Sequence, residues 1–565
     1  MKFQLSAISI ALSNCLLIGN AVIPHPAFAQ SANTLSLEQR QKQAQEFDQA
    51  SQEAIEKKNY LAAAELAIKG HQVIPNGGGL AYNAACAYAL AGKTELAFQW
   101  LDHSLEAGYA RLDHIQTDSD LESLRADPRW ASYIGRVKES AKIQAALWDS
   151  SAWKTPFAEQ LSEEERVAGL SKFWSEVKYN FIFTDTLKKL DWDAVYLKYL
   201  TRVKAATSTA EYYRILMEMC ALLQDGHTNI AAPDQLYSSE FTVPPFRTRL
   251  IEGKIIITDV ADAPLREQGI VRGVEVSRVN GVNAQDWARK HIAPIVSAST
   301  PQDLDSRIFG SQFLMGRKTD RLQVEFKDTT GKTWVSGVER VTYGKRNQGI
   351  ERPGAFSWKM LDGEVAYVAL NSFGDDTAAN EYLKNFAEIS KAKAIIFDVR
   401  ENGGGSSTVG YKVLATLTDQ ATSSSHAETR DYKPSYRAWG RPDSNFNFNA
   451  WSFPAHGQFH FKGKVVVLTS PRTYSAAEDF AVAFDWMKRG VIIGEATGGS
   501  TGQPLSFTLP GGGSARVCTK KDTYPDGKEF VGVGVQPHKH VIPRLEDYRN
   551  GKDTVLDAAL AYLKK

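Results

Sequence analysis

The chain has 565 residues, too many for one compact domain, and its length predicts three or four domains. Hydrophobic residues make up 43% and charged residues 23%, a composition of folded protein that excludes disorder along the whole chain. Sixty-six basic residues face 65 acidic ones, and this near balance argues against nucleic acid as a partner.

The first 29 residues are predicted to be a secretory signal peptide. A positive end at Lys2 precedes a mostly apolar stretch over 5–23, and residues 27–29 form a small-x-small cleavage site before Gln30. The alternative is an N-terminal membrane anchor. Beyond this segment no apolar run reaches about 18 residues, so we expect no membrane span after signal removal. The sequence therefore predicts an exported protein, periplasmic or extracellular.

The cysteines and paired histidines do not predict a metal site. Four widely spaced cysteines include no CxxC pair, and Cys15 would leave with the signal. The pairs His456/His460 and His538/His540 lack a carboxylate or third ligand at suitable spacing. We therefore expect no metal and no cofactor.

Residues 36–150 are alanine-rich with helical periodicity, and they contain a repeat. Two similar stretches begin at Asn59 and Gly92, 33 residues apart, close to the ~34-residue period of tetratricopeptide repeats. Only two units are readable, and a stack normally needs about three. The region is either a helical array without a partner or a surface that holds a substrate or a partner protein.

A second helical region is expected over 160–235. Capping boxes at Ser162/Glu165 and at Ser208/Glu211 mark helix starts within it. Helical patterning stops near residue 225.

The next region, 240–345, changes to short alternating strands and glycine turns. Strands are predicted at 253–258 and 274–281, the second ending in an Asn-Gly turn. A small β-rich module is expected here.

From 355 to 565 strands alternate with helices, which predicts a layered α/β domain. Unbroken apolar runs, typical of strands buried on both faces, are among the strands expected at 365–372, 394–399, 464–469 and 490–494. Helices are expected at 376–390, 407–417 and 476–489.

Two loops that follow strands are candidate sites, because loops at strand ends carry sites in open α/β sheets. Residues 398–405 end in three glycines, which form either a tight turn or exposed amides for an oxyanion. The glycines lack a phosphate-binding pattern. In the second loop Ser475 precedes a helix, either as an N-cap with Glu478 or as a nucleophile.

A serine nucleophile needs a base. His227 directly follows a helix end in a glycine-containing turn, and it is either that base or an ordinary surface histidine.

Six segments, in this order, resemble the C-terminal-processing (tail-specific) serine peptidase family, and more closely its tricorn-type branch. These segments are 223–228, 367–373, 398–405, 473–480, 494–499 and 534–537, and the resemblance covers roughly 160–545. It implies a ClpP/crotonase-like spiral core, a helical subdomain and a PDZ-like insert at 240–345.

The resemblance also implies roles for individual residues. Ser475 matches the nucleophile, and His227 matches the general base of the tricorn-type branch. Gly403 or Gly404, together with the Ala476 amide, matches the oxyanion hole.

Glu529 lies near the family's acidic residue that orients the site. The chain departs from the family pattern at three places. Ser500 stands where the Ser–Lys branch has its lysine, His538 replaces an aspartate, and Gly273 is not followed by the usual aspartate. The first departure assigns the base role to His227.

The sequence thus predicts an exported serine endopeptidase that hydrolyses polypeptides through an acyl-enzyme on Ser475. The alternative is a catalytically inactive peptide- or ligand-binding protein on the same fold. An assembly scaffold built on 36–150 would not explain why the α/β loops carry Ser475, His227 and the glycines together.

Overall fold

The structure is a computed structural model, and it divides the chain into two compact units, one up to Gln144 and one from Ala145 onward. It describes residues 37–148, 150–351, 353–448 and 450–564. The predicted signal peptide, 1–29, lies outside the described residues. Within the described part of the chain, no helix has the length and apolar character needed to cross a membrane.

The first unit is a series of helices that pack in chain order. They are α1 (Leu37–Glu56), α2 (Tyr60–Val73), α3 (Gly78–Leu90), α4 (Thr94–Glu106), α5 (Leu112–Thr117) and α6 (Pro128–Trp148), which continues past Gln144. Successive helices contact each other from α1 to α4, and buried alanines such as Ala84 and Ala87 let α3 approach its neighbours closely. The stretches at Asn59 and Gly92 lead into α2 and α4 respectively.

The second unit begins with a helical subdomain. Its helices are α7 (Glu163–Asn180), α8 (Thr184–Leu190), α9 (Trp192–Ala205) and α10 (Thr209–Ala221). The complete capping box at Ser162 confirms the predicted start of α7. Ser208 caps α10, but the Glu211 carboxylate turns to Thr207. The Tyr213 hydroxyl donates to the Pro510 carbonyl and ties α10 to a hairpin.

That hairpin belongs to a three-stranded antiparallel sheet ordered β1-β18-β17. The strands are β1 (Asn229–Ala231), β17 (Pro504–Leu509) and β18 (Gly513–Cys518). Because β1 directly follows the turn that contains His227, the sheet anchors that turn to the C-terminal part of the chain.

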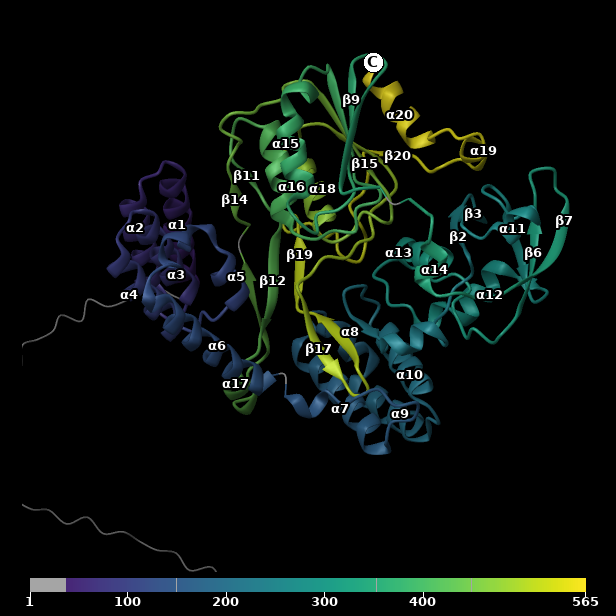
Figure 1. Ribbon diagram of the computed structural model, residues 1–565, viewed down its shortest axis with the longest axis horizontal. Coiled ribbons are helices and arrows are strands. Elements are labelled where there is room, and N and C mark those ends of the chain that lie inside the picture. Colours follow the sequence, from purple (N-terminus) through teal and green to yellow (C-terminus); the bar gives the residue numbers. More distant parts are fainter. Residues whose placement is uncertain (1–36, 149, 352, 449, 565) are drawn as a thin grey trace, which may run out of the picture. The chain divides into compact units, whose positions relative to one another are not determined.

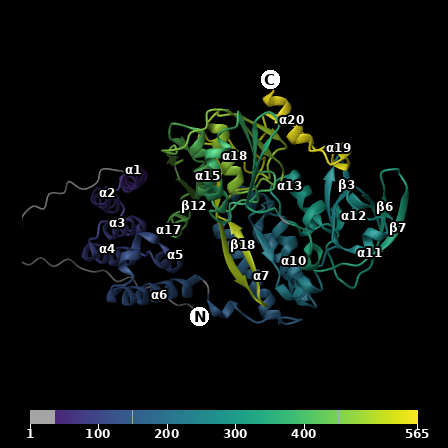
Figure 2. The ribbon, with the colours of Figure 1, turned by 45° about the horizontal axis from the view of Figure 1, so that its top comes forward.

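The β-rich insert is a six-stranded antiparallel sheet, in which five strands are ordered β2-β3-β4-β6-β7 and β5 pairs with β4. Its strands are β2 (Phe246–Ile251), β3 (Lys254–Val260), β4 (Glu275–Val279), β5 (Val282–Asn283), β6 (Leu322–Lys327) and β7 (Thr333–Val338). β7 forms its outer edge (Figure 2). Asn280 and Gly281, both at positive φ, form the predicted turn.

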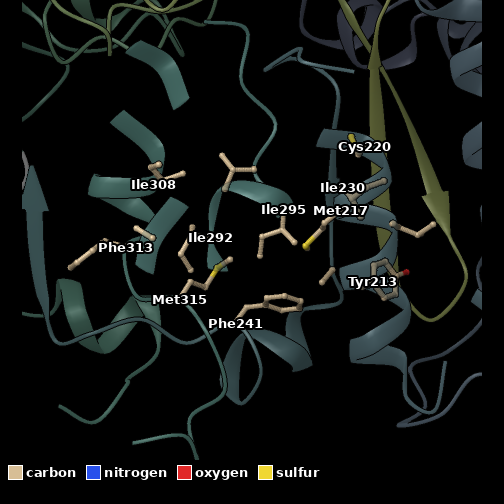
Figure 3. Packing of buried hydrophobic residues seen from close by; sticks show 14 of the residues in the cluster. Tyr213, Met217, Cys220, Ile230, Phe241, Ile292, Ile295, Ile308, Phe313 and Met315 are labelled. Atoms are coloured by element: carbon tan, nitrogen blue, oxygen red, sulfur yellow. The ribbon is translucent and has the colours of Figure 1, made fainter. Parts of the chain in front are cut away.

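Short helices complete the insert: α11 (Ala263–Glu267), α12 (Ala284–His291), α13 (Pro301–Ser306) and α14 (Tyr343–Asn347). Buried side chains from the insert and from α10 form one continuous core. Met217, Phe241, Ile295 and Met315 are among its members (Figure 3).

The α/β core is a six-stranded sheet ordered β20-β16-β15-β10-β9-β8 (Figure 1). Only β8 runs antiparallel to its neighbour. The strands are β8 (Phe356–Leu361), β9 (Val365–Leu370), β10 (Ala394–Asp398), β15 (Lys464–Thr469), β16 (Val491–Gly494) and β20 (Lys539–His540). The four predicted strands are confirmed as β9, β10, β15 and β16.

Helices cover both faces of this sheet. On one face α15 (Thr377–Ile389), α16 (Ser407–Leu414) and α18 (Ala476–Trp486) pack on alternate strand residues such as Ile395 and Phe397. On the other face α20 (Thr554–Leu563) packs on the intervening residues such as Ile396. This two-sided burial explains the unbroken apolar runs.

The remaining elements are β11 (Thr422–Ser423), β12 (His426–Asp431), α17 (Pro434–Ala438), β13 (Ser444–Phe448), β14 (Ser452–Phe453), β19 (Lys520–Thr523) and α19 (Leu545–Arg549). They include a sheet ordered β13-β12-β19, which lies next to the site described below.

Candidate active site

Ser475 occupies a sharp turn between β15 and α18. Its backbone has φ +55° and ψ −127°, a conformation that residues with a side chain rarely adopt. The turn is held by the Ser475 N–H, which donates to the Ser500 carbonyl at 3.1 Å and to the Glu478 carboxylate at 3.2 Å. Such strain persists only where the surroundings enforce it, and here it directs the hydroxyl away from the helix.

His227 meets this hydroxyl from the turn between α10 and β1. Its Nε2 lies 3.2 Å from Ser475 Oγ, and its Nδ1 lies 2.7 Å from Ser500 Oγ. The imidazole is stacked on the Tyr474 ring, with the ring centroids 5.1 Å apart. The site therefore brings together side chains that are 248 and 273 residues apart in the sequence.

Gly226 and Gly498 give Tyr474 the space to hold this position. A Cβ on Gly226 would lie 2.0 Å from the Tyr474 hydroxyl oxygen, and one on Gly498 would lie 2.5 Å from the Tyr474 ring. Both positions therefore require glycine, because the Tyr474 side chain comes too close for a Cβ. The stacked tyrosine fixes the plane of the His227 ring.

His227 is uncharged at neutral pH in this environment. Burial, together with the nearby cations Arg516, Arg307 and Lys520, lowers the pKa of His227 to about 3. At neutral pH the ring is therefore neutral, and one of its nitrogens has a free lone pair. Donation from Nδ1–H to the Ser500 oxygen leaves Nε2 free to accept the proton of Ser475.

Glu478 organises the loop that carries Ser500. Its carboxylate is fully buried and accepts hydrogen bonds from the Gly499 and Ser500 N–H groups at 2.7 and 2.8 Å and from the Thr497 hydroxyl at 2.5 Å. Burial raises the pKa of Glu478 to about 8 against these hydrogen bonds. The residue that the sequence indicates as half of a capping box thus also fixes Ser500.

The glycine loop, residues 398–405, lies against Ser475. The Gly404 N–H donates to Asn402 Oδ1 at 2.9 Å. Gly403 lines a different hollow, beside Arg472. The oxyanion role of these two amides stays a prediction, and the bond to Asn402 argues against the Gly404 amide.

The direction of the Gly405 amide follows from its backbone pairing. It forms a parallel bridge with Phe373, in which the bonds run from Phe373 N–H to the Gly404 carbonyl and from Ser406 N–H to the Phe373 carbonyl. That pattern leaves the Gly405 N–H pointing away from Phe373. Ala476 is the first residue of α18, where an N–H has no acceptor within the helix. Gly405, Ala476 and Ser475 line one hollow.

Glu529 does not contact the candidate triad. Its side chain is 60% exposed and pairs with Lys521 at 2.5 Å. Among the described residues, no hydrogen bond joins Glu529 to His227 or Ser500. The orienting role of Glu529 therefore stays a prediction without a contact that supports it, and Ser500 occupies the Nδ1 side of the imidazole. Sequence reasoning marked Ser500 only as the replacement for a lysine.

Metal-ligand side chains do not gather at this site. In the part of the chain that the structure describes, one group of three could hold an ion, and it consists of Cys86, Asp118 and Asp120 in the helical N-terminal unit. The arrangement around Ser475 can instead perform nucleophilic acyl transfer without a cofactor.

Comparison with known families agrees with this chemistry. Residues 364–541 match the model of Peptidase family S41, and residues 162–221 match that of the Tricorn protease C1 domain. This chain carries a peptidase family S41 domain. Ser475 lies inside the S41 domain, whereas His227 lies outside both matched ranges.

Curated relatives of this chain are named as processing peptidases. The carboxyl-terminal-processing protease of Picosynechococcus sp. is 22% identical over 387 residues, which are 66% of this chain and 83% of the relative. The chloroplastic C-terminal processing peptidase of Tetradesmus obliquus is 22% identical over 348 residues, 60% of this chain and 69% of the relative. Together with the family match, these relatives make the chain a serine-type peptidase.

A solved structure shares the fold. Mature CPAF complexed with lactacystin superposes with a TM-score of 0.57 at 14% identity, covering 71% of this chain and 98% of CPAF. The helical N-terminal region followed by an α/β S41 core is therefore the architecture of the chain.

Proposed function

We propose that this S41 protein is an exported serine endopeptidase that hydrolyses polypeptides through an acyl-enzyme on Ser475, with His227 as the general base. The observation that carries the proposal is the 3.2 Å contact between His227 Nε2 and Ser475 Oγ, beside Gly405 and Ala476, which line the same hollow as Ser475.

In the first step Ser475 Oγ attacks the carbonyl carbon of the scissile bond while its proton moves to His227 Nε2. The carbonyl oxygen gains the negative charge and is stabilised by the Gly405 and Ala476 N–H groups. The carbon–nitrogen bond then breaks as His227 gives its proton to the leaving amine. The acyl group remains bonded to Ser475 Oγ.

Water completes the cycle. It attacks the acyl carbon as its proton moves to His227 Nε2, and the bond to Ser475 Oγ breaks as the proton returns to that oxygen. Ser500 accepts from Nδ1–H throughout and keeps Nε2 directed at Ser475. A single amide donor of this kind contributes about 10²–10³-fold to the rate in comparable sites.

Turnover of an unfolded, fluorescence-quenched protein tests the proposal. Ser475→Ala is expected to lower turnover by about 10³-fold or more while the melting temperature holds. Ser390→Ala, at a half-buried serine on the end of α15, is the control and keeps wild-type turnover. Equal turnover by wild type and Ser475→Ala would favour the rival interpretation, a catalytically inactive peptide- or ligand-binding protein.

We further propose that 36–150 is a tetratricopeptide-like module that holds a polypeptide substrate or partner protein, and that 240–345 is PDZ-like. The 33-residue period and the helix pairs α1/α2 and α3/α4 support the first assignment. The antiparallel sheet with short helices supports the second. Tight binding of unfolded protein to the full Ser475→Ala chain, lost when 36–144 is deleted, would support a holding role.

The predicted signal peptide supports export. N-terminal sequencing of the protein made in its own cell is expected to start at Gln30, and a retained Met1 in the mature protein would contradict this proposal.

A further inference from the structure

A hollow of about 680 Å³ opens directly beside the nucleophile. Ser475, Ala476 and Gly405 line it, so a carbonyl bound by the Gly405 and Ala476 amides would lie beside it. A cleft of this volume holds a large side chain with room for neighbouring atoms. The side chains that line the rest of the hollow therefore determine which residue fits next to the scissile bond.

The hollow contains more negative than positive charge. Asp479 and Asp522 both line it and are buried, and Lys520 is the cation beside them. The Lys520 ammonium pairs with Asp522 at 2.8 Å. Asp479 instead accepts hydrogen bonds from the Ser407 and Ser425 hydroxyls at 2.6 and 3.0 Å.

Asp479 thus accepts hydrogen bonds from two neutral hydroxyl groups, and a second carboxylate, that of Asp522, lies near it. Burial, with the charge of Asp522, raises the pKa of Asp479 to about 6, although Lys520 and the two serine hydroxyls act in the opposite direction. Its anion is therefore costly to keep in the empty hollow. A cation that enters the hollow would relieve this cost.

The position of Asp479 determines how long a cationic side chain must be to reach it. It lies four residues after Ser475, and its N–H bonds to the Ser475 carbonyl, so it is one turn, about 5.4 Å, along α18. Long side chains such as arginine and lysine span that distance from a backbone held at Ser475, whereas alanine or serine do not.

Aromatic side chains in the hollow suit the apolar stem and the charged head of a long cationic side chain. Tyr411, Phe448 and Trp451 line the hollow together with Asp479. Aromatic faces pack well against the methylene stem of lysine or arginine and attract the cationic head.

We propose that this hollow receives the P1 side chain, that of the residue whose carbonyl is attacked, and that Asp479 makes it select arginine and lysine. The inference rests on the proposed function, because it assigns the specificity of the same site. An arginine at P1 would bring its guanidinium to Asp479, the buried carboxylate of the hollow with which Lys520 forms no direct ion pair among the described contacts.

A pair of fluorogenic peptides that differ only at P1 tests the selection. One carries arginine and the other citrulline, which has nearly the same shape without the charge. For the wild-type protein we expect kcat/KM to favour arginine by about tenfold or more, and Asp479→Asn to reduce the ratio to about two or less. Because the readout is a ratio, a general loss of activity does not produce this result.

Asp485→Asn is the matched control. Asp485 is a buried carboxylate on the same helix, it accepts from the Tyr524 hydroxyl at 3.0 Å, and it does not line the hollow. The arginine-to-citrulline ratio of this variant is expected to equal that of wild type. A wild-type ratio near one, or an equal fall in both variants, overturns the inference.

The wild-type chain alone keeps the inference falsifiable if Asp479→Asn does not fold. A series with arginine, lysine, leucine or glutamate at P1 should rank the two cations first, and any other order overturns the proposal. Labelling by a fluorophosphonate, with Ser475→Ala as the blank, distinguishes failure of the P1 selection from failure of the proposed function. Labelling and cleavage without P1 preference reject only the selection, whereas no labelling and no cleavage of any peptide reject the proposed function with it.

Discussion

At the residue scale, the unusual feature of the candidate site is a histidine whose Nδ1 contacts no carboxylate among the described residues. Ser500 Oγ lies 2.7 Å from Nδ1, and burial together with the nearby cations keeps the imidazole neutral. A hydroxyl fixes the tautomer of the ring, but it stabilises an imidazolium less than a carboxylate does. The base is therefore oriented by its surroundings rather than strengthened by a negative charge.

This environment predicts an unusual pH profile. Because burial and nearby cations lower the pKa of His227 to about 3, the neutral form that accepts the Ser475 proton persists far below pH 6.5. Activity rises as pH rises through the pKa of the base, so we expect the acid limb of kcat/KM to have its midpoint below about pH 5. A peptide without titratable groups should be used, and a midpoint near 6.5 would contradict the prediction.

Ser500 and Glu529 are the two candidates for the group that orients His227, and variants at these two positions should differ in activity. Ser500→Ala removes the acceptor of Nδ1–H, so we expect kcat to fall by about 10–10²-fold with KM nearly unchanged. Glu529→Gln removes only the exposed pair with Lys521 and should keep activity within about twofold.

A fall in kcat without a change in KM distinguishes a loss of His227 orientation from a loss of folding. The fluorophosphonate labelling rate of Ser500→Ala should fall with kcat while the melting temperature stays within about 2 °C of wild type. If Glu529→Gln is the variant that loses kcat, the orienting role returns to Glu529.

At the scale of elements, the site depends on how closely the glycine loop approaches the start of α18. A Cβ on Gly404 would lie 2.6 Å from Ser475 Cβ and 2.8 Å from the Tyr474 carbonyl oxygen, and Gly404 has φ +98°. Gly403, its neighbour, has no atom within 4 Å of the same position. The two glycines therefore form a matched pair for substitution.

We expect Gly404→Ala to lower kcat/KM by about 10²-fold, because the loop must move away from Ser475 and carries the Gly405 amide with it. It should also destabilise the protein by about 1–3 kcal/mol through backbone strain. Gly403→Ala should change both quantities little. Peptide kinetics and urea unfolding of the two variants measure this, and equal effects would contradict the close approach as the cause.

The elements of the core could be read from the sequence because their burial leaves a local pattern. β10 and β15 are buried on both faces and appear as unbroken apolar runs, and α7 begins at a complete capping box. β8 could not be read in this way, because it is the sheet edge and its side chains alternate between partly buried and exposed. Periodicity identifies such a strand poorly.

The same distinction applies to the site: local patterns predict some of its residues, and long-range contacts determine the others. Ser475 and the glycine loop follow strands, so strand patterning found them. The glycine-containing turn marked His227 as a candidate, and family resemblance favoured it as the base. Which amide is free depends on the Asn402 side chain and on the bridge to Phe373, and these contacts leave no periodic trace. The partner of His227 Nδ1 is 273 residues away, which spacing alone does not indicate.

At the scale of the whole molecule, the chain consists of two units with separate hydrophobic cores. The core of the helical N-terminal unit is built from residues such as Leu101 and Val137, and it shares no residue with the cores of the second unit. Ser475, His227 and Ser500 all belong to the unit from Ala145 onward. Units with cores of their own can fold separately.

This division predicts that the peptidase unit works alone on small substrates. A chain that lacks residues 1–144 should fold and cleave a short peptide with kcat/KM within about twofold of the mature full chain, because every described hydrogen bond of the three site residues lies within the remaining unit. Calorimetry of the mature full chain should show two transitions, one of which the shortened chain retains. Loss of peptide cleavage by a shortened chain that keeps its transition would mean that the N-terminal helices contribute to the site itself, whereas unchanged peptide cleavage with slower turnover of an unfolded protein would place their role in holding large substrates.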